Sequence, residues 1–306
     1  TKHIRGLVYF YMTCVVSELS HTMLTIQPYI ITFSLQDRLY HFPPPKRVLR
    51  RSHLATTSSL HSNGNGSSAG KIKRSVLSSE GKTKLNLYPD RDFYSYPRFV
   101  THVDDGFITT LNNLYRQRLK PDSEILDIMS SWVSHLPQET KYKRVVGHGL
   151  NPQELAKNPK LDYFFVKDLN KDQTFELESS SFDAVLCTVS VQYLQEPEKI
   201  FAEVFRVLRP GGVFIVSFSN RMFYEKAVAA WRDGSAYSRA QLVVQYFQAV
   251  EGFTKPEVIR KVEEENGVGK KDAFFFQWIP KLMGFMSGSD PFYAVIAYKN
   301  FKPLND

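Results

Sequence analysis

Apolar residues beyond residue 121 occur either as short continuous runs or at helical spacing. The continuous runs predict five buried strands, at residues 125–129, 144–146, 163–167, 182–187 and 213–218. Before the last of these strands, five apolar residues share one face of an amphipathic helix: Ile200, Phe201, Val204, Phe205 and Leu208. Strands that alternate with helices predict a parallel sheet with right-handed crossovers.

Capping residues predict where several helices begin and end. Asp104 or Asp105 can cap a helix whose apolar residues continue to Tyr115. Asn151 precedes a proline and is followed three residues later by a glutamate, which is the pattern of a capping box. The amphipathic helix stops at the proline and glycines of residues 209–212. These boundaries fit the alternation of strands and helices.

The pattern changes in the C-terminal third of the chain. Helices are expected at about residues 224–231, 239–250 and 254–265, the last of them after a further capping box. Two apolar runs follow, at residues 273–278 and 292–299, with no long helix between them. This last pair can close the sheet with an antiparallel edge. The predicted fold class is α/β, with a doubly wound, mostly parallel, seven-stranded sheet and an antiparallel last strand.

Basic residues are concentrated in the first 79 residues. The chain has a formal net charge of +8, and this segment holds ten Lys and Arg against two acids, which leaves 29 of each sign in the rest. An acid-poor segment rich in Arg and Ser is typical of an organelle transit peptide, and a plain disordered tail is the alternative. Its Ser- and Thr-rich tract favours the chloroplast over the mitochondrion. We therefore expect a targeting segment at residues 1–79, a helical cap at residues 80–120 and the main domain at residues 121–306.

Composition and charge exclude several classes of protein. A hydrophobic content of 42% is ordinary for a globular chain, and two cysteines are too few for a disulfide scaffold. No apolar run reaches the 18 residues that would predict a membrane span. Because the chain beyond residue 79 is neutral, no nucleic-acid partner is expected. The acids after His102 are explained better by a helix cap than by metal ligation, so no metal is expected.

Residues 182–220 carry a distinctive series of motifs. The series contains the strand FDAVLC, a helix that ends in RVLRPGG with Glu203 three residues before Arg206, and a strand directly afterwards. It resembles the class I S-adenosylmethionine-dependent methyltransferases, in particular the type 11 group that acts on small molecules. The GFTKPEVI segment at residues 252–259 is similar to the family segment before its last strands. The resemblance covers about residues 121–300 and implies a Rossmann-like fold with S-adenosylmethionine as cofactor.

The chain departs from the family in the loop after its first strand. The family has a glycine-rich loop there, which lets the backbone approach the methionine part of the cofactor. Here Asp127 keeps the family acid, but the glycine positions fall on Met129, Ser131 and Val133. Serine hydroxyls in this loop are expected to contact the cofactor or to cap a following helix: Ser130, Ser131 and Ser134.

The acid that the family places after its second strand is also missing. That acid binds the ribose hydroxyls, and its position falls on Gly149. Asn151 either reaches the ribose or caps a helix, and Asp168 either matches the family acid near the adenine or belongs to a surface turn. The resemblance implies nine cofactor-binding candidates: Asp127, Ser130, Ser131, Gly147, Gly149, Asn151, Asp168, Leu169 and Thr188.

Four further residues are candidates for the substrate pocket. Methyl transfer from a sulfonium requires positioning and exclusion of water, and it needs a base only where the nucleophile carries a proton. His135 in the divergent loop is the candidate base, or else a structural histidine. Gln192, Tyr193 and Asn220 follow the fourth and fifth strands, where the family lines its substrate pocket.

Other enzyme classes lack their motifs in this chain. Neither a G-x-G-x-x-G nor a G-x-S-x-G follows a predicted strand, which argues against nicotinamide dehydrogenases and hydrolases. The sequence predicts a methyltransferase acting on a small-molecule metabolite, in an organelle. The missing glycines and ribose acid leave two alternatives: a catalytically inactive methyltransferase fold that binds or regulates, and a pocket for another nucleotide or metabolite. The sequence leaves the oligomeric state open.

Overall fold

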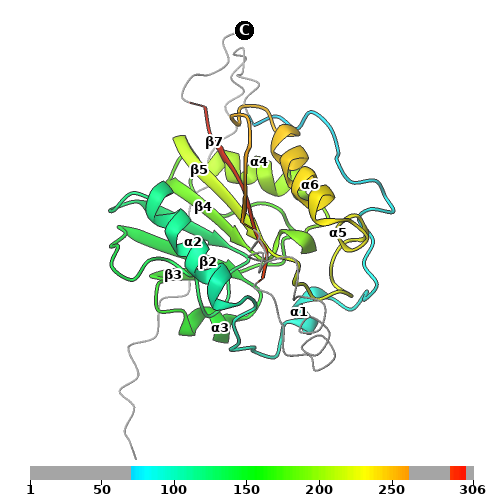
Figure 1. Ribbon diagram of the computed structural model, residues 1–306, viewed down its shortest axis with the longest axis horizontal. Helices are drawn as coiled ribbons and strands as arrows, with labels where there is room; N and C mark the ends of the chain where they lie inside the picture. Colours follow the sequence, from blue (N-terminus) through cyan, green and yellow to red (C-terminus); the bar gives the residue numbers. More distant parts are fainter. Residues whose placement is uncertain (1–69, 262–289, 301–306) are drawn as a thin grey trace, which may run out of the picture. The chain divides into compact units, whose positions relative to one another are not determined.

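The computed structural model describes residues 70–261 and 290–300. Within these ranges one sheet has the strand order β3-β2-β1-β4-β5-β7-β6 (Figure 1). Its strands are β1 (Glu124–Ile128), β2 (Arg144–Gly149), β3 (Tyr163–Val166), β4 (Phe182–Thr188), β5 (Leu208–Phe218), β6 (Glu257–Lys261) and β7 (Phe292–Tyr298). Strands β1 to β5 pair in parallel, whereas β7 is antiparallel to both of its neighbours. The predicted fold class is confirmed.

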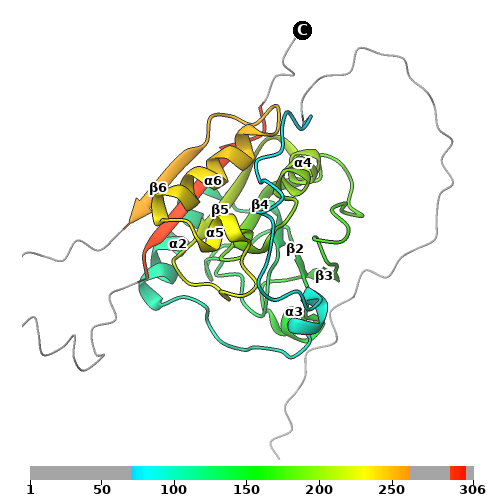
Figure 2. The ribbon, with the colours of Figure 1, turned by 90° about the vertical axis from the view of Figure 1, so that its right-hand side faces the viewer.

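Helices cover both faces of the sheet. They are α1 (Asp90–Phe93), α2 (Asp105–Arg118), α3 (Pro152–Lys157), α4 (Pro197–Val207), α5 (Ala229–Arg232) and α6 (Ala236–Gln248). Helices α2 and α3 lie on one face, and α4, α5 and α6 lie on the other (Figures 1 and 2). Successive strand residues point to opposite faces, so Ile125 joins the core beneath α2 while Leu126 joins the core beneath α4.

Two of the helix caps expected from the sequence are present. The Asp104 carboxylate accepts the Phe107 N–H at 2.8 Å and begins α2. The Asn151 side chain accepts the N–H groups of Gln153 and Glu154 at 2.9 and 3.1 Å and begins α3. Each cap satisfies N–H groups that have no partner within the helix. Helix α3 therefore starts directly after β2, beside the carboxyl edge of the sheet.

Two crossovers between parallel strands contain no helix. They are residues 129–143, between β1 and β2, and residues 167–181, between β3 and β4. The serines after β1 therefore do not cap a helix there, which corrects that part of the expectation. The loop folds back instead over the end of β2, where the Ser130 N–H donates to the His148 carbonyl at 2.7 Å. Ligands of open α/β sheets bind at this edge, so this loop shapes the site.

A strand replaces the helix predicted at residues 254–265. The Thr254 N–H donates to the Tyr298 carbonyl at 2.9 Å, and the Thr254 hydroxyl accepts the Tyr298 N–H at 3.0 Å. Strand β6 continues this pairing with β7, from Glu257 opposite Ile296 to Lys261 opposite Phe292. The helix prediction is wrong over the described part of that range, because the free edge of β7 offers N–H and C=O groups that only a strand satisfies.

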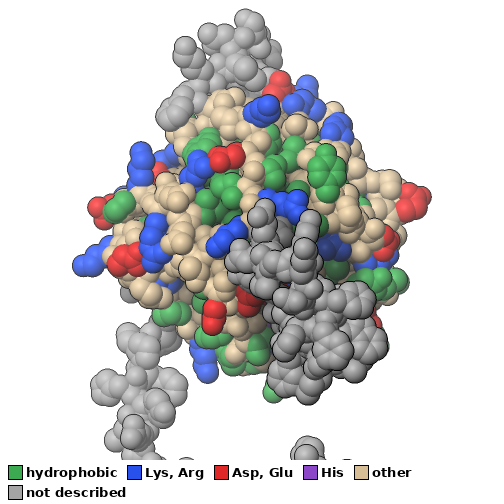
Figure 3. All heavy atoms as spheres, viewed as in Figure 1, with side chains coloured by type: hydrophobic (Ala, Val, Ile, Leu, Met, Phe, Trp, Pro, Cys, Tyr) green, Lys and Arg blue, Asp and Glu red, His purple; other side chains and the backbone are tan. Residues whose placement is uncertain are grey.

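The remaining differences from the expected elements are small. Strand β2 extends three residues further than predicted, and the helices expected at residues 224–231 and 239–250 are the shorter α5 and the shifted α6. The strand expected at residues 273–278 lies outside the described residues. No described helix is long and apolar enough to cross a membrane. On the face drawn in Figure 3, acidic and basic side chains are interspersed.

The segment before α2 runs across the domain toward its site (Figure 2). Ile72 forms a β-bridge with Val250, and Leu77 is buried. The N–H groups of Leu85 and Asn86 both donate to the Glu225 carbonyl, at 3.1 and 3.0 Å. Residues 70–79, the end of the expected targeting segment, thus contact the domain. Beyond them the segment reaches the carboxyl edge of the sheet with α1.

Candidate functional site

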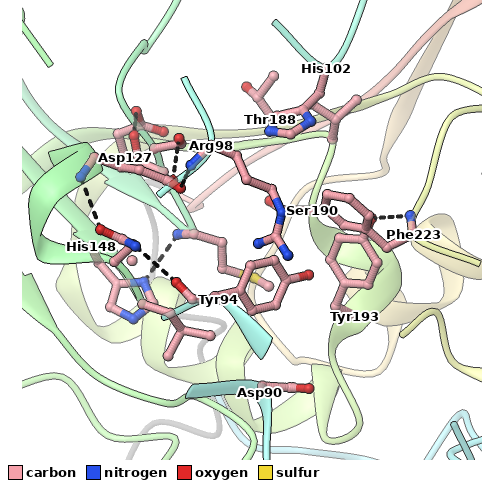
Figure 4. Close-up of a pocket in the computed structure, with 18 of the residues that line it drawn as sticks. Asp90, Tyr94, Arg98, His102, Asp127, His148, Thr188, Ser190, Tyr193 and Phe223 are labelled. Atoms are coloured by element: carbon pink, nitrogen blue, oxygen red, sulfur yellow. Dashed lines mark hydrogen bonds between the residues drawn. The ribbon is translucent and has the colours of Figure 1, made fainter. Parts of the chain in front are cut away.

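A cavity of about 350 Å³ lies at the carboxyl edge of the sheet. One side is made by the ends of β1, β2 and β4 together with the loop after β1, and we call it the sheet wall (residues 127–135, 148–154 and 188–190). The opposite side is made by residues 90–102 and 221–223, which we call the N-terminal wall. Residues 167–170 and 193–194 complete the lining. Figure 4 shows side chains from both walls pointing toward the space between them.

Asp127 ends β1 on the sheet wall. It is 3% exposed, and burial raises the pKa of its carboxyl to about 6 despite the hydrogen bonds from Ser130 and Ser134. The Ser130 hydroxyl donates to this carboxylate at 2.6 Å. Met129, which takes the first glycine position of the family loop, has a φ of 54°. The loop thus keeps a left-handed turn there without glycine, which costs about 1–2 kcal/mol.

His148 on β2 holds the loop in place. Its Nδ1 accepts the Met129 N–H at 3.0 Å, and its Nε2 lies 2.9 Å from the Lys167 carbonyl. These partners fix the neutral tautomer with the proton on Nε2, which donates to that carbonyl. Burial lowers the pKa of His148 to about 4. The imidazole therefore links β1, β2 and β3 at the floor of the cavity, a role that its sequence context did not reveal.

Gly149 lets the loop lie directly on the end of β2. A Cβ atom at this position would come 2.4 Å from the Ser130 carbonyl oxygen. Backbone atoms of the loop therefore lie against the residue where the family carries its ribose acid. The missing acid and the altered loop path are two aspects of one packing arrangement.

Glu154 in the first turn of α3 is a buried acid that the sequence analysis treated only as part of a cap. It is 8% exposed and lines the cavity. Its two oxygens accept the Ser131 hydroxyl at 2.6 Å and the Arg98 N–H at 2.7 Å. Asn151 makes a second connection of this kind, because its amide donates to the carbonyls of Tyr94 and Ser95. Both side chains join the sheet wall to the N-terminal wall.

The far end of the cavity lies after β3 and β4. The Asp168 carboxylate accepts the Asn170 N–H at 3.0 Å and lines the cavity beside Leu169. Asp168 is therefore a turn residue that also lines the cavity. Thr188 ends β4, and its hydroxyl lies 2.9 Å from the Tyr115 hydroxyl. Val189 follows with a φ of 44°, an unusual conformation for a β-branched residue, and such strain clusters at functional sites.

A buried charge cluster anchors the N-terminal wall. The Asp90 carboxylate binds the Lys84 ammonium at 2.6 Å, the Lys226 ammonium at 3.0 Å and the Asn170 amide at 2.9 Å. Burial alone would raise the pKa of Asp90, but these hydrogen bonds and charges together lower it. Lys226 is fully buried and also donates to the carbonyls of Asn86 and Tyr88. The cluster carries two positive charges against one negative charge.

Aromatic rings and Arg98 form the face of the N-terminal wall. The Arg98 guanidinium carbon lies 4.8 Å from the Phe93 ring centroid and 5.3 Å from the Phe223 ring centroid. The Tyr193 hydroxyl accepts the Phe223 N–H at 2.8 Å, and the Tyr94 ring lies 6.4 Å from the Tyr193 ring. Figure 4 places the guanidinium among these rings, inside the cavity.

Two histidines line the cavity close to the loop. Burial lowers the pKa of His135 to about 4, with a smaller contribution from His102. Burial also lowers the pKa of His102, which Glu154 partly offsets. Both imidazoles are therefore neutral near pH 7 and accept protons only weakly. His135 has a φ of 51° and Met129 has a φ of 54°, so the loop contains a left-handed residue near each of its ends.

The structure brings ten of the thirteen predicted site residues to the cavity: Asp127, Ser130, Ser131, His135, Gly149, Asn151, Asp168, Leu169, Thr188 and Tyr193. Three others lie outside its lining. A Cβ on Gly147 would come 2.3 Å from a Leu161 methyl group, so Gly147 faces the core. Gln192 is 1% exposed and donates to the Val189 carbonyl, and Asn220 is exposed to solvent. Within the described ranges, no group of three His, Cys, Asp or Glu converges to hold a metal.

Comparison with known proteins finds a family model that matches part of this domain. Residues 130–216 match the model of a family described as a methyltransferase domain. This part of the sheet domain is therefore similar to methyltransferase domains. The matched residues run from the loop after β1 to β5, and they supply most of the sheet wall. The resemblance read from residues 182–220 is thereby confirmed.

Two curated relatives match parts of the chain. The sterol 24-C-methyltransferase of Schizosaccharomyces pombe is 25% identical over 164 residues, which are 51% of this chain and 41% of that protein. The biotin biosynthesis bifunctional protein BioHC of Teredinibacter turnerae is 30% identical over 88 residues, 29% of this chain and 14% of that protein. The chain thus spans less than half the length of either relative. Among solved structures, the [4+2]-cyclase SpnF has a TM-score of 0.44 at 15% identity, covering 63% of this chain and 82% of that chain.

Proposed function

We propose that this chain is an S-adenosylmethionine-dependent methyltransferase that acts on a small molecule. The observation that carries the proposal is the coincidence of the family match with the cavity: the matched residues supply the ends of β2 and β4 and the loop after β1. The cavity between the two walls has a volume of about 350 Å³, which suits a small ligand. The sterol methyltransferase match supports the same class of reaction, since that relative is named for transfer to a small molecule.

The polar groups that line the cavity fit the parts of the cofactor. Asp127 and the loop after it would hold the ammonium end of the methionine part, since a buried carboxylate favours a cationic partner. Asp168 and Leu169 would hold the adenine. Glu154, rather than the absent acid at Gly149, is the carboxylate placed near the end of β2 to accept ribose hydroxyls.

The bound cofactor supplies an electrophilic methyl group on a positively charged sulfur. The chain's own residues would orient the acceptor and exclude water between the two walls, because positioning and desolvation provide most of the rate enhancement in such a displacement. His135 and His102 would present neutral imidazole nitrogens to the acceptor. Their lowered pKa values make them hydrogen-bond partners that orient an acceptor rather than strong bases.

A second function is favoured by the loop itself. The loop backbone lies on Gly149, and the family's glycines and ribose acid are absent. A methyltransferase fold that binds a metabolite without catalysis would tolerate all three changes. The two functions differ in one measurable property, which is affinity for the cofactor and its product.

Calorimetric titration of S-adenosylmethionine and S-adenosylhomocysteine into the full chain tests the proposal. We expect saturable binding, and we expect Asp168→Ala to weaken it about tenfold through loss of a hydrogen bond to a charged group. Glu176→Ala is the matched control, because Glu176 is an exposed acid in the same crossover and lies outside the lining. Absence of binding at millimolar cofactor, with the protein folded, would favour the non-catalytic function.

The proposal places this activity in an organelle, with the chloroplast ahead of the mitochondrion. It rests on the acid-poor, Arg- and Ser-rich composition of residues 1–79. N-terminal sequencing of the mature protein tests it. Cleavage before residue 70 is expected, because residues 70–79 already contact the domain, and an intact start would contradict the proposal.

A further inference from the structure

We infer that the N-terminal wall contains an oxyanion subsite, formed by the guanidinium of Arg98 and the hydroxyl of Tyr94. Such a subsite would take a carboxylate or phosphate group of a bound ligand. The inference deepens the proposed function, on which it rests for the nature of the ligand. The group could belong to the methyl acceptor or to the cofactor's own carboxylate, and the chemistry of the subsite is the same for both.

The hydrogen bonds of Arg98 are incomplete inside the cavity. One terminal nitrogen, Nη2, donates to the Phe93 carbonyl at 3.1 Å and thereby fixes the plane of the guanidinium. The other, Nη1, is buried and has no hydrogen-bond partner. Among the described residues, no carboxylate lies within 4.0 Å of this guanidinium. A buried charged donor without an acceptor is rare in folded proteins, and a ligand oxygen would satisfy it.

Tyr94, on the same wall, also has a polar group without a hydrogen-bond partner. Its hydroxyl is buried without a hydrogen-bond partner, and the Arg98 guanidinium carbon lies 5.7 Å from its ring centroid. Burial is the main cause of a pKa well above the ordinary tyrosine value, so the hydroxyl stays protonated and can donate. Figure 4 shows the Tyr94 ring beside the guanidinium, in the open part of the cavity. Two unsatisfied donors therefore come from the same short segment.

The surrounding charges favour an anion at this wall. Lys84 and Lys226 together exceed the charge of Asp90 by one, and Lys226 lies 5.0 Å from the same Phe93 ring that Arg98 contacts. Arg98 places a third cation beside this cluster. Glu154 accepts the Ser131 hydroxyl and the Arg98 backbone N–H, and it forms no ion pair with the guanidinium. The guanidinium is thus left to a ligand.

Titration of the full chain with inorganic phosphate, S-adenosylhomocysteine and 5′-methylthioadenosine tests the inference. The last compound lacks the carboxylate of the second. Arg98→Gln removes the charge, and Arg91→Gln is the matched control, since Arg91 is an exposed arginine in the same segment outside the lining. Tyr94→Phe removes only the hydroxyl, which has no described partner, so this variant is expected to fold.

Two results support the subsite and distinguish its ligand. If phosphate binds to protein saturated with S-adenosylhomocysteine, and Arg98→Gln weakens that binding tenfold or more, the anion belongs to the acceptor. If Arg98→Gln instead weakens S-adenosylhomocysteine tenfold and leaves 5′-methylthioadenosine unchanged, the anion is the cofactor's carboxylate. In both cases Tyr94→Phe should cause a smaller loss, of about threefold, and Arg91→Gln should cause none.

One result overturns the subsite. If neither phosphate nor S-adenosylhomocysteine binding changes in folded Arg98→Gln and Tyr94→Phe, the inference fails. Complete absence of S-adenosylhomocysteine binding would contradict the proposed function alone, because the phosphate titration of the free protein still measures the subsite. The two failures are therefore distinguishable.

Discussion

The two walls of the cavity satisfy their polar groups in opposite ways. On the sheet wall, three buried side chains accept hydrogen bonds from the loop after β1: Asp127, His148 and Glu154. Burial raises the pKa of Asp127 and lowers that of His148. On the N-terminal wall, Arg98 and Tyr94 keep donors without partners. These sheet-wall side chains have partners within the protein, whereas two donors of the N-terminal wall have none among the described residues. Selectivity for the ligand is therefore expected to lie in the N-terminal wall.

The charge cluster provides the strongest test of that contrast. Asp90→Ala would leave the ammonium groups of Lys84 and Lys226 buried without their acid, which typically costs about 3–5 kcal/mol. We expect a loss of this size in the free energy of unfolding, measured by urea denaturation. Asp92→Ala, at an exposed position two residues away, should change it by less than about 0.5 kcal/mol. Equal effects of the two changes would contradict an anchoring role for the cluster.

The sheet wall predicts a loss of stability on acidification. The folded pKa of His148 is about 4 against an ordinary value of 6.5, so between these values the unfolded chain binds more protons, and stability falls as the pH falls through this window. At about 1.4 kcal/mol per pKa unit, titration of this one group removes about 3 kcal/mol of stability as the pH falls from 7 to below 4.

His148→Gln should flatten the pH dependence of the unfolding free energy between pH 6.5 and 4. Asp127 acts in the opposite direction, since its folded pKa of about 6 exceeds the ordinary 3.8, so its contribution rises on acidification below pH 6. His135 acts in the same direction as His148. If His148→Gln keeps the full pH dependence of the unfolding free energy, His148 is not the titrating group.

The two glycines of β2 provide the smallest and most local test. In Gly149→Ala, the new methyl group would meet the Ser130 carbonyl at 2.4 Å, and a backbone atom cannot rotate away. In Gly147→Ala, it would meet the end of the Leu161 side chain at 2.3 Å, which can adopt another rotamer. Both changes are expected to cost about 1–3 kcal/mol of stability, with Gly149 at the upper end.

Only Gly149→Ala should also weaken cofactor binding, because it displaces the loop of the sheet wall. Calorimetric titration of S-adenosylhomocysteine into both variants distinguishes a site effect from a loss of stability. If Gly147→Ala loses as much affinity for S-adenosylhomocysteine as Gly149→Ala does, the packing of β2, rather than the loop, controls the site.

The sequence predicted the parts of the site that lie at strand ends. Asp127, Asp168 and Thr188 reached the cavity because the carboxyl ends of parallel strands meet at one edge, and that edge follows from the alternation of elements. Gln192 and Asn220 lie outside the cavity lining, since the direction of a side chain just beyond a strand depends on its own hydrogen bonds. Arg98 and Tyr94 carry no motif, and only the path of their segment brings them to the cavity.

By itself, the sequence determined the five parallel strands, the helix caps at Asp104 and Asn151, and the resemblance to methyltransferases. These features depend on local periodicity and on residues close in the chain, which a single sequence records. The tertiary structure decided that residues 257–261 form a strand on the edge of β7, that the loop after β1 lies on Gly149, and that a distant segment supplies the unsatisfied wall. Each of those outcomes depends on a partner far away in the chain, and local pattern does not specify which partner a free strand edge or a buried donor will meet.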